Sequence, residues 1–191
     1  ERLGGYPCFV KPANLGSSVG VSKASNEKEL ICGIYEAGKF DRRVIVEEGM
    51  NIREVETAVI GNDEPIAAVV GEIIPSAEFY DYTAKYFDGG QSKLIIPADL
   101  PKETSEKIRE YAVQAYKTLD CAGFARVDFF VTKDTGEIYI NEINTIPGFT
   151  KFSMFSALFK AAGIDYPHVI ERIVDYGYER YNIKNSRKTN I

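Results

Sequence analysis

Residues 123–144 read GFARVDFFVTKDTGEIYINEIN, two runs rich in apolar residues on either side of Asp134-Thr135-Gly136. A short segment containing Asp and Gly between two such runs is typical of a β-hairpin turn, so we expect antiparallel strands at residues 124–132 and 137–144. If residues 134–136 form a three-residue loop centred on Thr135, the numbers of cross-strand partners add up to twice 135, which is 270. This register decides which side chains of the hairpin share a face.

Four polar side chains share one face in this register, because side chains alternate along a strand. Asp128 faces Glu142 and Arg126 faces Asn144, with opposed Cβ atoms about 5 Å apart. The other face carries the side chains that we expect to form core, namely Ala125, Val127, Phe129, Tyr139 and Ile143.

The two opposed carboxylates indicate a cation site. Like charges directly opposite each other repel, and burial would raise the pKa of one of them unless a cation neutralised the pair. Asp128, Glu142 and the carbonyl oxygen of Asn144 are hard ligands that suit magnesium. The alternative interpretation is a solvated polar face on which Arg126 pairs with Asp128.

Two other segments carry weaker indications. Lys11 ends a strand-like run and enters residues 12–20, where glycines let the backbone approach phosphate oxygens and serines can donate to them. The pattern GxxxxGK[ST] is absent, so this loop alone decides nothing. Glu47 and Glu54 frame a turn between two β runs, where backbone groups could bind an adenine ring and a carboxylate could bind a ribose diol. Alone, a solvated acidic turn is the simpler interpretation.

The rest of the chain predicts alternating strands and helices. Asn26 can cap a helix that ends at Gly38, with Glu29 completing a capping box. Residues 75–92 carry aromatic and charged residues without periodicity, which predicts a long ordered loop. The remaining expected strands are residues 7–10, 21–22, 43–47, 54–60 and 66–73, and the remaining expected helices are residues 102–119, 153–162 and 167–181.

Composition excludes two classes of partner. The formal net charge is -5 over 191 residues and the basic residues are spread along the chain, so no continuous basic face for nucleic acid is expected. No window approaches the roughly 20 consecutive apolar residues that a membrane-spanning helix needs. We therefore expect a cytoplasmic protein that binds neither nucleic acid nor a membrane.

Three segments in this order resemble the ATP-grasp family and, within it, the D-alanine:D-alanine ligases. They are Lys11-Pro12 with residues 16–20 (GSSVG), residues 79–86 (FYDYTAKY), and residues 123–128 (GFARVD) with residues 141–150 (NEINTIPGFT). The resemblance covers nearly the whole chain, from Val10 to the last helix. It implies an α+β ATP-grasp fold with a largely antiparallel sheet and flanking helices.

The resemblance also implies how a nucleotide is held. Lys11 and Lys85 match the residues that hold the ATP phosphates, Glu47 matches the residue at the adenine, and Glu54 matches the residue at the ribose.

The same resemblance assigns the metal and the catalytic groups. Asp128, Glu142 and Asn144 match the ligands of two magnesium or manganese ions. In such ligases the γ-phosphate passes to the carboxylate of a first D-alanine, and the amine of the second attacks the acylphosphate. Arg126 and the backbone N–H of Gly148 match the groups that stabilise the resulting oxyanion.

Three further positions match the family pattern. Ser153 matches the residue that holds the carboxylate of the second substrate. Ser17 and Tyr86 match a hydrogen-bonded pair that closes the phosphate loop over the site. A tyrosine after Lys85 favours D-alanine over D-lactate as second substrate.

The resemblance implies that this chain is one part of a ligase for peptidoglycan precursor synthesis. Residues 1–48 would be the remainder of the central lobe, residues 49–183 the carboxyl-terminal lobe, and residues 184–191 a polar, disordered tail. The amino-terminal domain, which binds the first D-alanine, would be missing, so we expect the chain alone to be inactive and the full-length protein to be a homodimer. The alternatives are a D-alanine:D-serine or D-alanine:D-lactate ligase, or a non-catalytic ATP-binding module.

Overall fold

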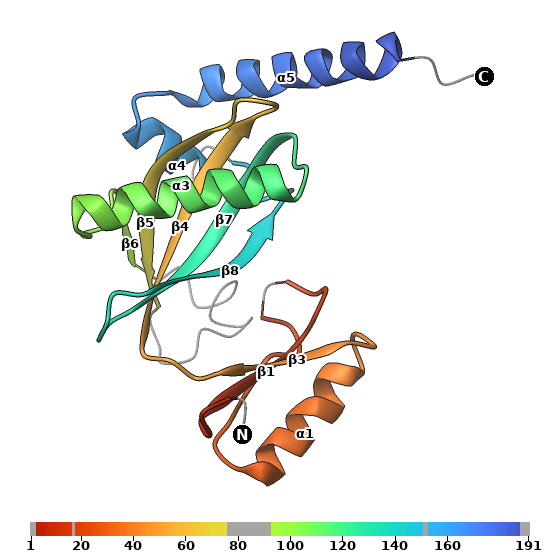
Figure 1. Cartoon of the computed structure of the whole chain (residues 1–191), viewed down its shortest axis with the longest axis vertical. Coiled ribbons are helices and arrows are strands. Elements are labelled where there is room, and N and C mark those ends of the chain that lie inside the picture. The colour runs from red at the N-terminus through yellow and green to blue at the C-terminus, as the bar shows by residue number, and fades with distance from the viewer. Residues whose placement is uncertain (1–2, 17, 76–92, 151–152, 188–191) are drawn as a thin grey trace. The chain divides into compact units, whose positions relative to one another are not determined.

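The structure is a computed structural model that describes residues 3–16, 18–75, 93–150 and 153–187 (Figure 1). The chain forms two compact units, and the division falls between Asn51 and Ile52. The smaller unit holds the described residues before this point, together with Pro75 and Lys93. The larger unit holds residues 52–74 and the chain from residue 94 onward.

The smaller unit is a three-stranded antiparallel sheet with one helix packed on it. The strands are β1 (Cys8–Pro12), β2 (Ser22–Ala24) and β3 (Val44–Glu48), in the order β2-β1-β3, and the helix is α1 (Glu27–Gly38). The predicted cap is confirmed, because Asn26 accepts a hydrogen bond from the Glu29 backbone N–H at 3.0 Å. A Cβ at Gly33 would lie 2.5 Å from the Ser22 Oγ, so glycine lets α1 approach the sheet closely.

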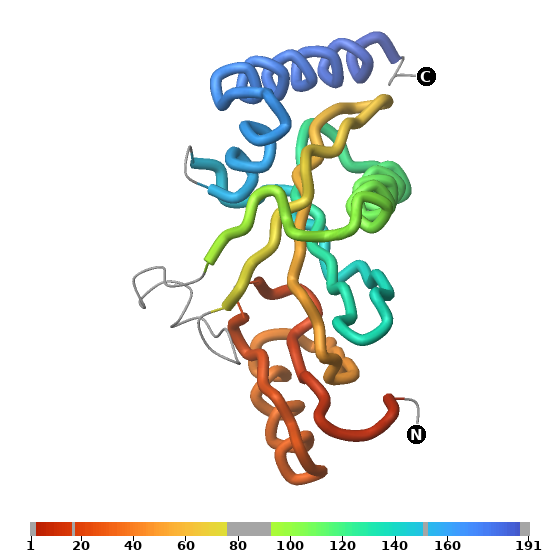
Figure 2. Tube along the Cα trace, turned by 90° about the vertical axis from the view of Figure 1, so that its left-hand side faces the viewer, coloured from red at the N-terminus to blue at the C-terminus, as the bar shows by residue number. Residues whose placement is uncertain are grey.

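The larger unit is built on a five-stranded sheet in the order β6-β5-β4-β7-β8. Helix α3 (Lys102–Thr118) covers one face, and α4 (Met154–Ala161) and α5 (Tyr166–Ser186) lie on the other (Figure 2). The strands are β4 (Ile52–Gly61), β5 (Ile66–Ile74), β6 (Lys93–Ile95), β7 (Gly123–Thr132) and β8 (Ile138–Asn144). The predicted α+β architecture with a largely antiparallel sheet is confirmed.

A separate hydrophobic core lies on each face of this sheet. Val127 and Phe129 of β7 pack with Tyr116 of α3, whereas Phe124 of β7 packs with Phe155 of α4. Because side chains alternate along β7, its even-numbered residues face the side of the sheet that carries α4. Arg126 and Asp128 therefore project on that side.

The predicted hairpin register holds at the polar residues and fails nearer the turn. Arg126 pairs with Asn144 and Asp128 with Glu142, as predicted, but Val131 pairs with Ile138, and these two numbers add up to 269. The turn closes with a hydrogen bond from the Thr132 N–H to the Glu137 carbonyl, so it has four residues rather than three. A register shift at Asn141 restores the predicted pairing.

Because of this shift, the prediction that Tyr139 lies in the core is wrong. Tyr139 lies before the extra residue, so it leaves the apolar face and is 42% exposed. Ile138 packs against the core on the α3 side in its place. The other predicted core residues, Ala125, Val127, Phe129 and Ile143, do pack there.

Most predicted elements are present, with differences at the ends. Strand β6 is missed because it is a three-residue edge strand next to a polar segment. Helix α5 continues to Ser186, so residues 184–186 of the predicted disordered tail are helical. The predicted long loop falls almost entirely on residues 76–92, outside the described residues.

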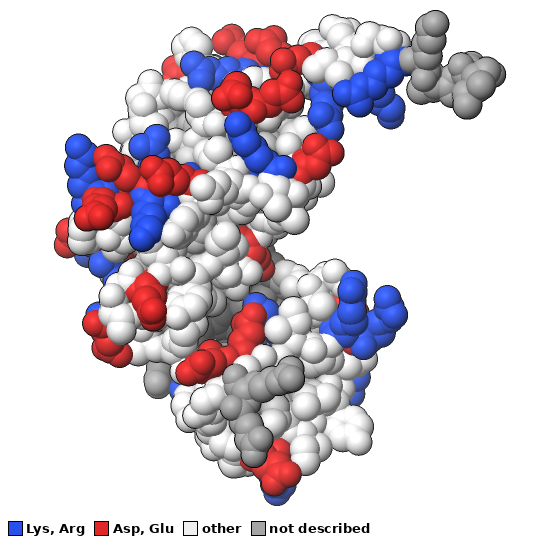
Figure 3. Space-filling view, viewed as in Figure 1, with Lys and Arg blue, Asp and Glu red and all other residues white. Residues whose placement is uncertain are grey.

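The surface of the larger unit mixes both signs of charge. Figure 3 shows acidic and basic side chains interspersed over α3 and α5 on the face in view. No helix within the described ranges is long and apolar enough to span a bilayer.

Candidate functional site

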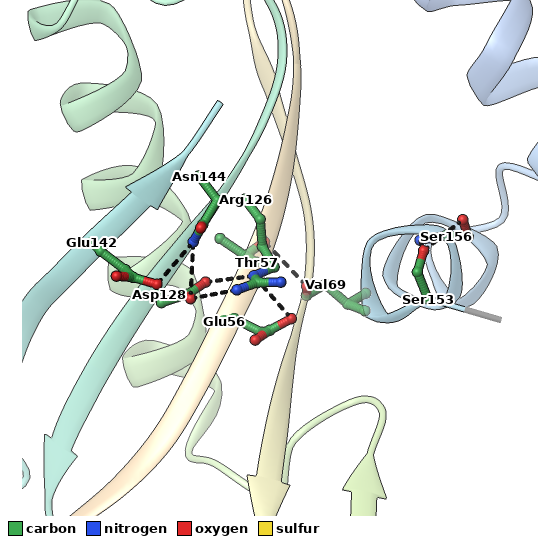
Figure 4. A network of polar contacts seen from close by, with 9 residues as sticks. All are labelled: Glu56, Thr57, Val69, Arg126, Asp128, Glu142, Asn144, Ser153 and Ser156. Atoms are coloured by element: carbon green, nitrogen blue, oxygen red, sulfur yellow. Dashed lines mark hydrogen bonds and ion pairs between the residues drawn. The ribbon is translucent and has the colours of Figure 1, made fainter. Parts of the chain in front are cut away.

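Three carboxylates form a row across the middle of the larger sheet. Glu56 of β4 is the register partner of Asp128 of β7, which is in turn the partner of Glu142 of β8. Partners in an antiparallel pair project on the same face, so all three lie on the side that carries α4 (Figure 4). Asp128 and Glu142 were predicted to meet, whereas Glu56 was not identified from the sequence.

Arg126 binds two members of this row. Its Nε and Nη2 donate to the two carboxylate oxygens of Asp128, each at 2.7 Å, which is a bidentate pair. Its Nε also lies 3.3 Å from Oε1 of Glu56. The side chains of Arg126, Asp128 and Glu56 are only 23%, 15% and 4% exposed, so these charges interact where water screens them little.

This environment keeps Arg126 charged. Burial lowers the pKa of its guanidinium, but the hydrogen bonds to Asp128 and the charges of Glu56, Asp128 and Glu142 more than offset this, and the pKa is raised. The predicted alternative is thus correct that Arg126 pairs with Asp128. The face is solvated only towards β8, because Arg126, Asp128 and Glu56 are largely buried whereas Glu142 is exposed.

Asn144 shows that one point can reach both predicted metal-binding carboxylates. Its side-chain nitrogen lies 3.2 Å from Oδ2 of Asp128 and 3.2 Å from Oε1 of Glu142. The hydrogens of this N–H2 group carry partial positive charge and lie between the two carboxylates. A cation would be favoured at the same place. Rotation of the amide would present its carbonyl oxygen instead, so the donor set fits a hard divalent cation. The described residues hold no group of three His, Cys, Asp or Glu side chains placed for a metal, so this candidate site depends on the amide.

The chain after β8 is anchored by Phe149, which holds the neighbouring Gly148. The Phe149 ring packs 5.5 Å from that of Phe124 and 5.3 Å from that of Phe155. Gly148 itself is exposed in an irregular segment, and a Cβ there would meet nothing within 4 Å. Among the described residues, its N–H has no hydrogen-bond partner.

Ser153 is the N-cap of α4. Its Oγ accepts from the Ser156 N–H at 3.4 Å and donates to the Thr150 carbonyl at 2.8 Å. In Figure 4 it lies on α4, apart from the polar network on β4, β7 and β8. The structure therefore gives Ser153 a structural role in capping, and its predicted contact with substrate stays a prediction.

The predicted nucleotide residues fall in different parts of the chain. In the smaller unit, Lys11 Nζ lies 2.7 Å from Oε1 of Glu47, an ion pair that the sequence did not predict. Glu54 belongs to β4 of the larger unit, two residues before Glu56 and on the same face. The remaining predicted positions, Ser17, Lys85 and Tyr86, lie outside the described residues.

Known proteins are similar to this chain over most of its length. A family model described as D-ala D-ala ligase C-terminus matches residues 1–175. A D-alanine–D-alanine ligase of Acetivibrio thermocellus is 60% identical over 182 residues, which are 95% of this chain and 48% of that protein.

Solved structures of ligases are also similar to this chain. The VanG D-Ala:D-Ser ligase of Enterococcus faecalis is 42% identical with a TM-score of 0.81, over 91% of this chain and 50% of that one. The D-alanine-D-alanine ligase of Coxiella burnetii is 35% identical with a TM-score of 0.83, over 94% and 47%. The chain thus spans about half the length of these relatives.

The antiparallel sheet, its flanking helices and these structural relatives define an ATP-grasp module. Ligases of this class depend on ATP. More narrowly, the chain belongs to the family described as D-ala D-ala ligase C-terminus.

Proposed function

We propose that this chain supplies the metal- and nucleotide-binding part of an ATP-dependent ligase that joins two D-alanines through an acylphosphate. The observation that carries the proposal is the meeting of Asp128, Glu142 and Asn144 around one point, beside the paired guanidinium of Arg126. A non-catalytic nucleotide-binding module would need no buried guanidinium at the ligands.

Each residue of this site then has a task. Asp128, Glu142 and the carbonyl oxygen of Asn144 hold magnesium or manganese. A cation held there would supply charge neutralisation and positioning for the transferred phosphoryl group. Arg126, whose raised pKa keeps it protonated, binds the oxyanion formed when the amine attacks the acylphosphate. The exposed N–H of Gly148 is the second donor to that oxyanion.

We assign binding of the nucleotide and of the second substrate to residues whose side chains contact other protein groups in this structure. Lys11 binds ATP phosphates and Glu47 the adenine, so ATP replaces the ion pair between these two side chains. Glu54 binds the ribose. The hydroxyl hydrogen that Ser153 gives to Thr150 is donated instead to the carboxylate of the second substrate.

D-serine is the second candidate for the acceptor. The specific observation in its favour is the similarity to the VanG D-Ala:D-Ser ligase of Enterococcus faecalis, at 42% identity. The curated relative at 60% identity is a D-alanine–D-alanine ligase, which is why we place D-alanine first.

The proposal can be tested with a chimera, because the relatives are twice as long as this chain. The amino-terminal half of the Acetivibrio thermocellus ligase would be joined to this chain, and ADP release would be measured with D-alanine, D-serine or D-lactate as acceptor. We expect D-alanine to give the highest kcat/KM and the chain alone to give no turnover. A folded chimera that binds ATP but releases no ADP with any acceptor would overturn the proposal.

Arg126 provides the sharper variant. In the active chimera, Arg126→Lys should lower kcat by about 100-fold or more, because an ammonium cannot reproduce the forked geometry, while KM for ATP changes little. A variant with unchanged kcat would remove Arg126 from the mechanism.

A further inference from the structure

Glu56 is a buried carboxylate that the proposed reaction leaves without a task. Its side chain is 4% exposed, and it lies on β4 directly opposite Asp128. Burying a carboxylate is costly unless a positive charge accompanies it. Arg126 supplies that charge, with its Nε 3.3 Å from Oε1 of Glu56.

Asp128 cannot serve two partners fully at once. Both of its oxygens accept hydrogen bonds from Arg126, and Oδ2 also accepts from Asn144. If Asp128 coordinates a divalent cation, as the proposed function requires, the cation draws negative charge from its oxygens and weakens the bidentate pair with Arg126. With no other carboxylate nearby, a guanidinium in a largely buried site would then be destabilised or would move.

We propose that Glu56 is a positioning residue that keeps the Arg126 guanidinium in place on β4 when Asp128 turns to a cation. Glu56 remains within reach of the same Nε while Asp128 exchanges one partner for another. Arg126 thus stays where the oxyanion forms. The inference rests on the proposed function for the task of Arg126, but the exchange of partners can be measured without nucleotide or metal.

The chain contains a matched control on the opposite face of the same sheet. Arg53 forms a bidentate pair with Glu72 at 2.7 and 2.6 Å, and the Glu72 side chain is 9% exposed. Glu72→Gln removes a buried carboxylate from an arginine just as Glu56→Gln does. It leaves the surroundings of Arg126 unchanged.

The experiment replaces Asp128 by alanine, which imitates its departure. The Nε–H signal of Arg126 is followed by NMR in the 191-residue chain with labelled arginine, and is assigned by its absence in Arg126→Lys. We expect the signal in Asp128→Ala to stay shifted and in slow exchange with water, because Glu56, whose Oε1 lies 3.3 Å from the Nε, can then accept from it. Collapse of the signal to the position of a free guanidinium in Asp128→Ala would overturn the inference.

A second pair of variants makes the test specific to Glu56. Adding Glu56→Gln to Asp128→Ala should move the Arg126 Nε–H signal to the chemical shift of a free guanidinium. Its exchange with water should become faster by about tenfold or more, since a charge-assisted hydrogen bond is lost. Adding Glu72→Gln instead should leave it unmoved. A signal that persists with Glu56→Gln, or is lost equally with Glu72→Gln, would overturn the inference. Circular dichroism checks that each variant is folded.

Discussion

Arg126 lies among three carboxylates that come from three different strands. Glu56, Asp128 and Glu142 each raise its pKa, and one positive charge balances only one of the three when all are ionised. The row then carries two negative charges in excess, which a divalent cation would neutralise. This charge balance, rather than any single ligand, is the residue-scale argument for a metal at this site.

His168 allows a clean test of local electrostatics, because the chain has one histidine. Its hydrogen bond with Asp165, helped by the charges of Asp165 and Glu171, raises its pKa above the ordinary 6.5. The hydrogen bonds from His168 lower the pKa of Asp165 below the ordinary 3.8.

The sign of the effect on stability follows for each group. The raised pKa of His168 contributes stability that is complete below pH 6.5 and is lost as the pH rises through the folded pKa. The lowered pKa of Asp165 contributes stability above pH 3.8 that is lost as the pH falls through the folded pKa. We expect the imidazole NMR titration to have its midpoint above 6.5, and the midpoint in Asp165→Asn to return towards 6.5. Identical midpoints would contradict the assigned pair.

Gly71 provides a packing prediction beside the site. A Cβ there would lie 2.8 Å from Leu158 Cδ2 and 3.2 Å from Met154 Sδ, so glycine lets α4 lie close to β5. Gly71→Ala should lower the free energy of unfolding by about 1–3 kcal/mol through overpacking, as measured by urea denaturation. Gly177→Ala is the control, since nothing lies within 4 Å of its Cβ in α5, and it should stabilise by about 0.5–1 kcal/mol. Equal effects of the two changes would contradict this packing.

At the scale of elements, the hairpin explains what a sequence can predict. The partners Asp128 and Glu142 were predicted because both lie in one hairpin, where the turn and the alternation set the register. The longer turn and the extra residue at Asn141 cancel, so the predicted pairing was right although the predicted turn was wrong. Neither feature has a signal in the sequence that distinguishes it from a simple hairpin.

Helix α5 is fixed to the sheet by Asn62 at the end of β4. The Asn62 Nδ2 donates to the Tyr176 carbonyl at 3.0 Å and to Glu179 at 2.6 Å, and its Oδ1 accepts from the Gly123 N–H at 3.2 Å. Asn62→Ala should cost about 2 kcal/mol, because it leaves partly buried polar groups unpaired. We expect Asn62→Ala to accelerate amide hydrogen exchange more in α5 than in α3. Equal acceleration in both helices would indicate global destabilisation instead.

At the scale of the whole molecule, the sequence predicted local elements but not their neighbours. Glu56 was missed because β4 and β7 are far apart in sequence, and no local pattern reveals that they pair. The resemblance identified the family, but Ser17, Lys85 and Tyr86 lie outside the described residues, so the roles that it implies for them stay predictions. Half the length of the relatives has no counterpart here, so the complete reaction stays a proposal.

The most direct test of the account is site-resolved Mn²⁺ binding by the 191-residue chain. Substoichiometric Mn²⁺ should broaden the backbone amide NMR signals of residues 126–128 and 142–144, and excess Mg²⁺ should reverse the broadening. Glu142→Gln should weaken this binding by about tenfold or more, because a coordinating carboxylate is lost. Glu137→Gln, on the exposed turn of the same hairpin, should leave it unchanged. Broadening that is absent in the unmodified chain, or that is equal in Glu142→Gln, would contradict a metal site between these strands.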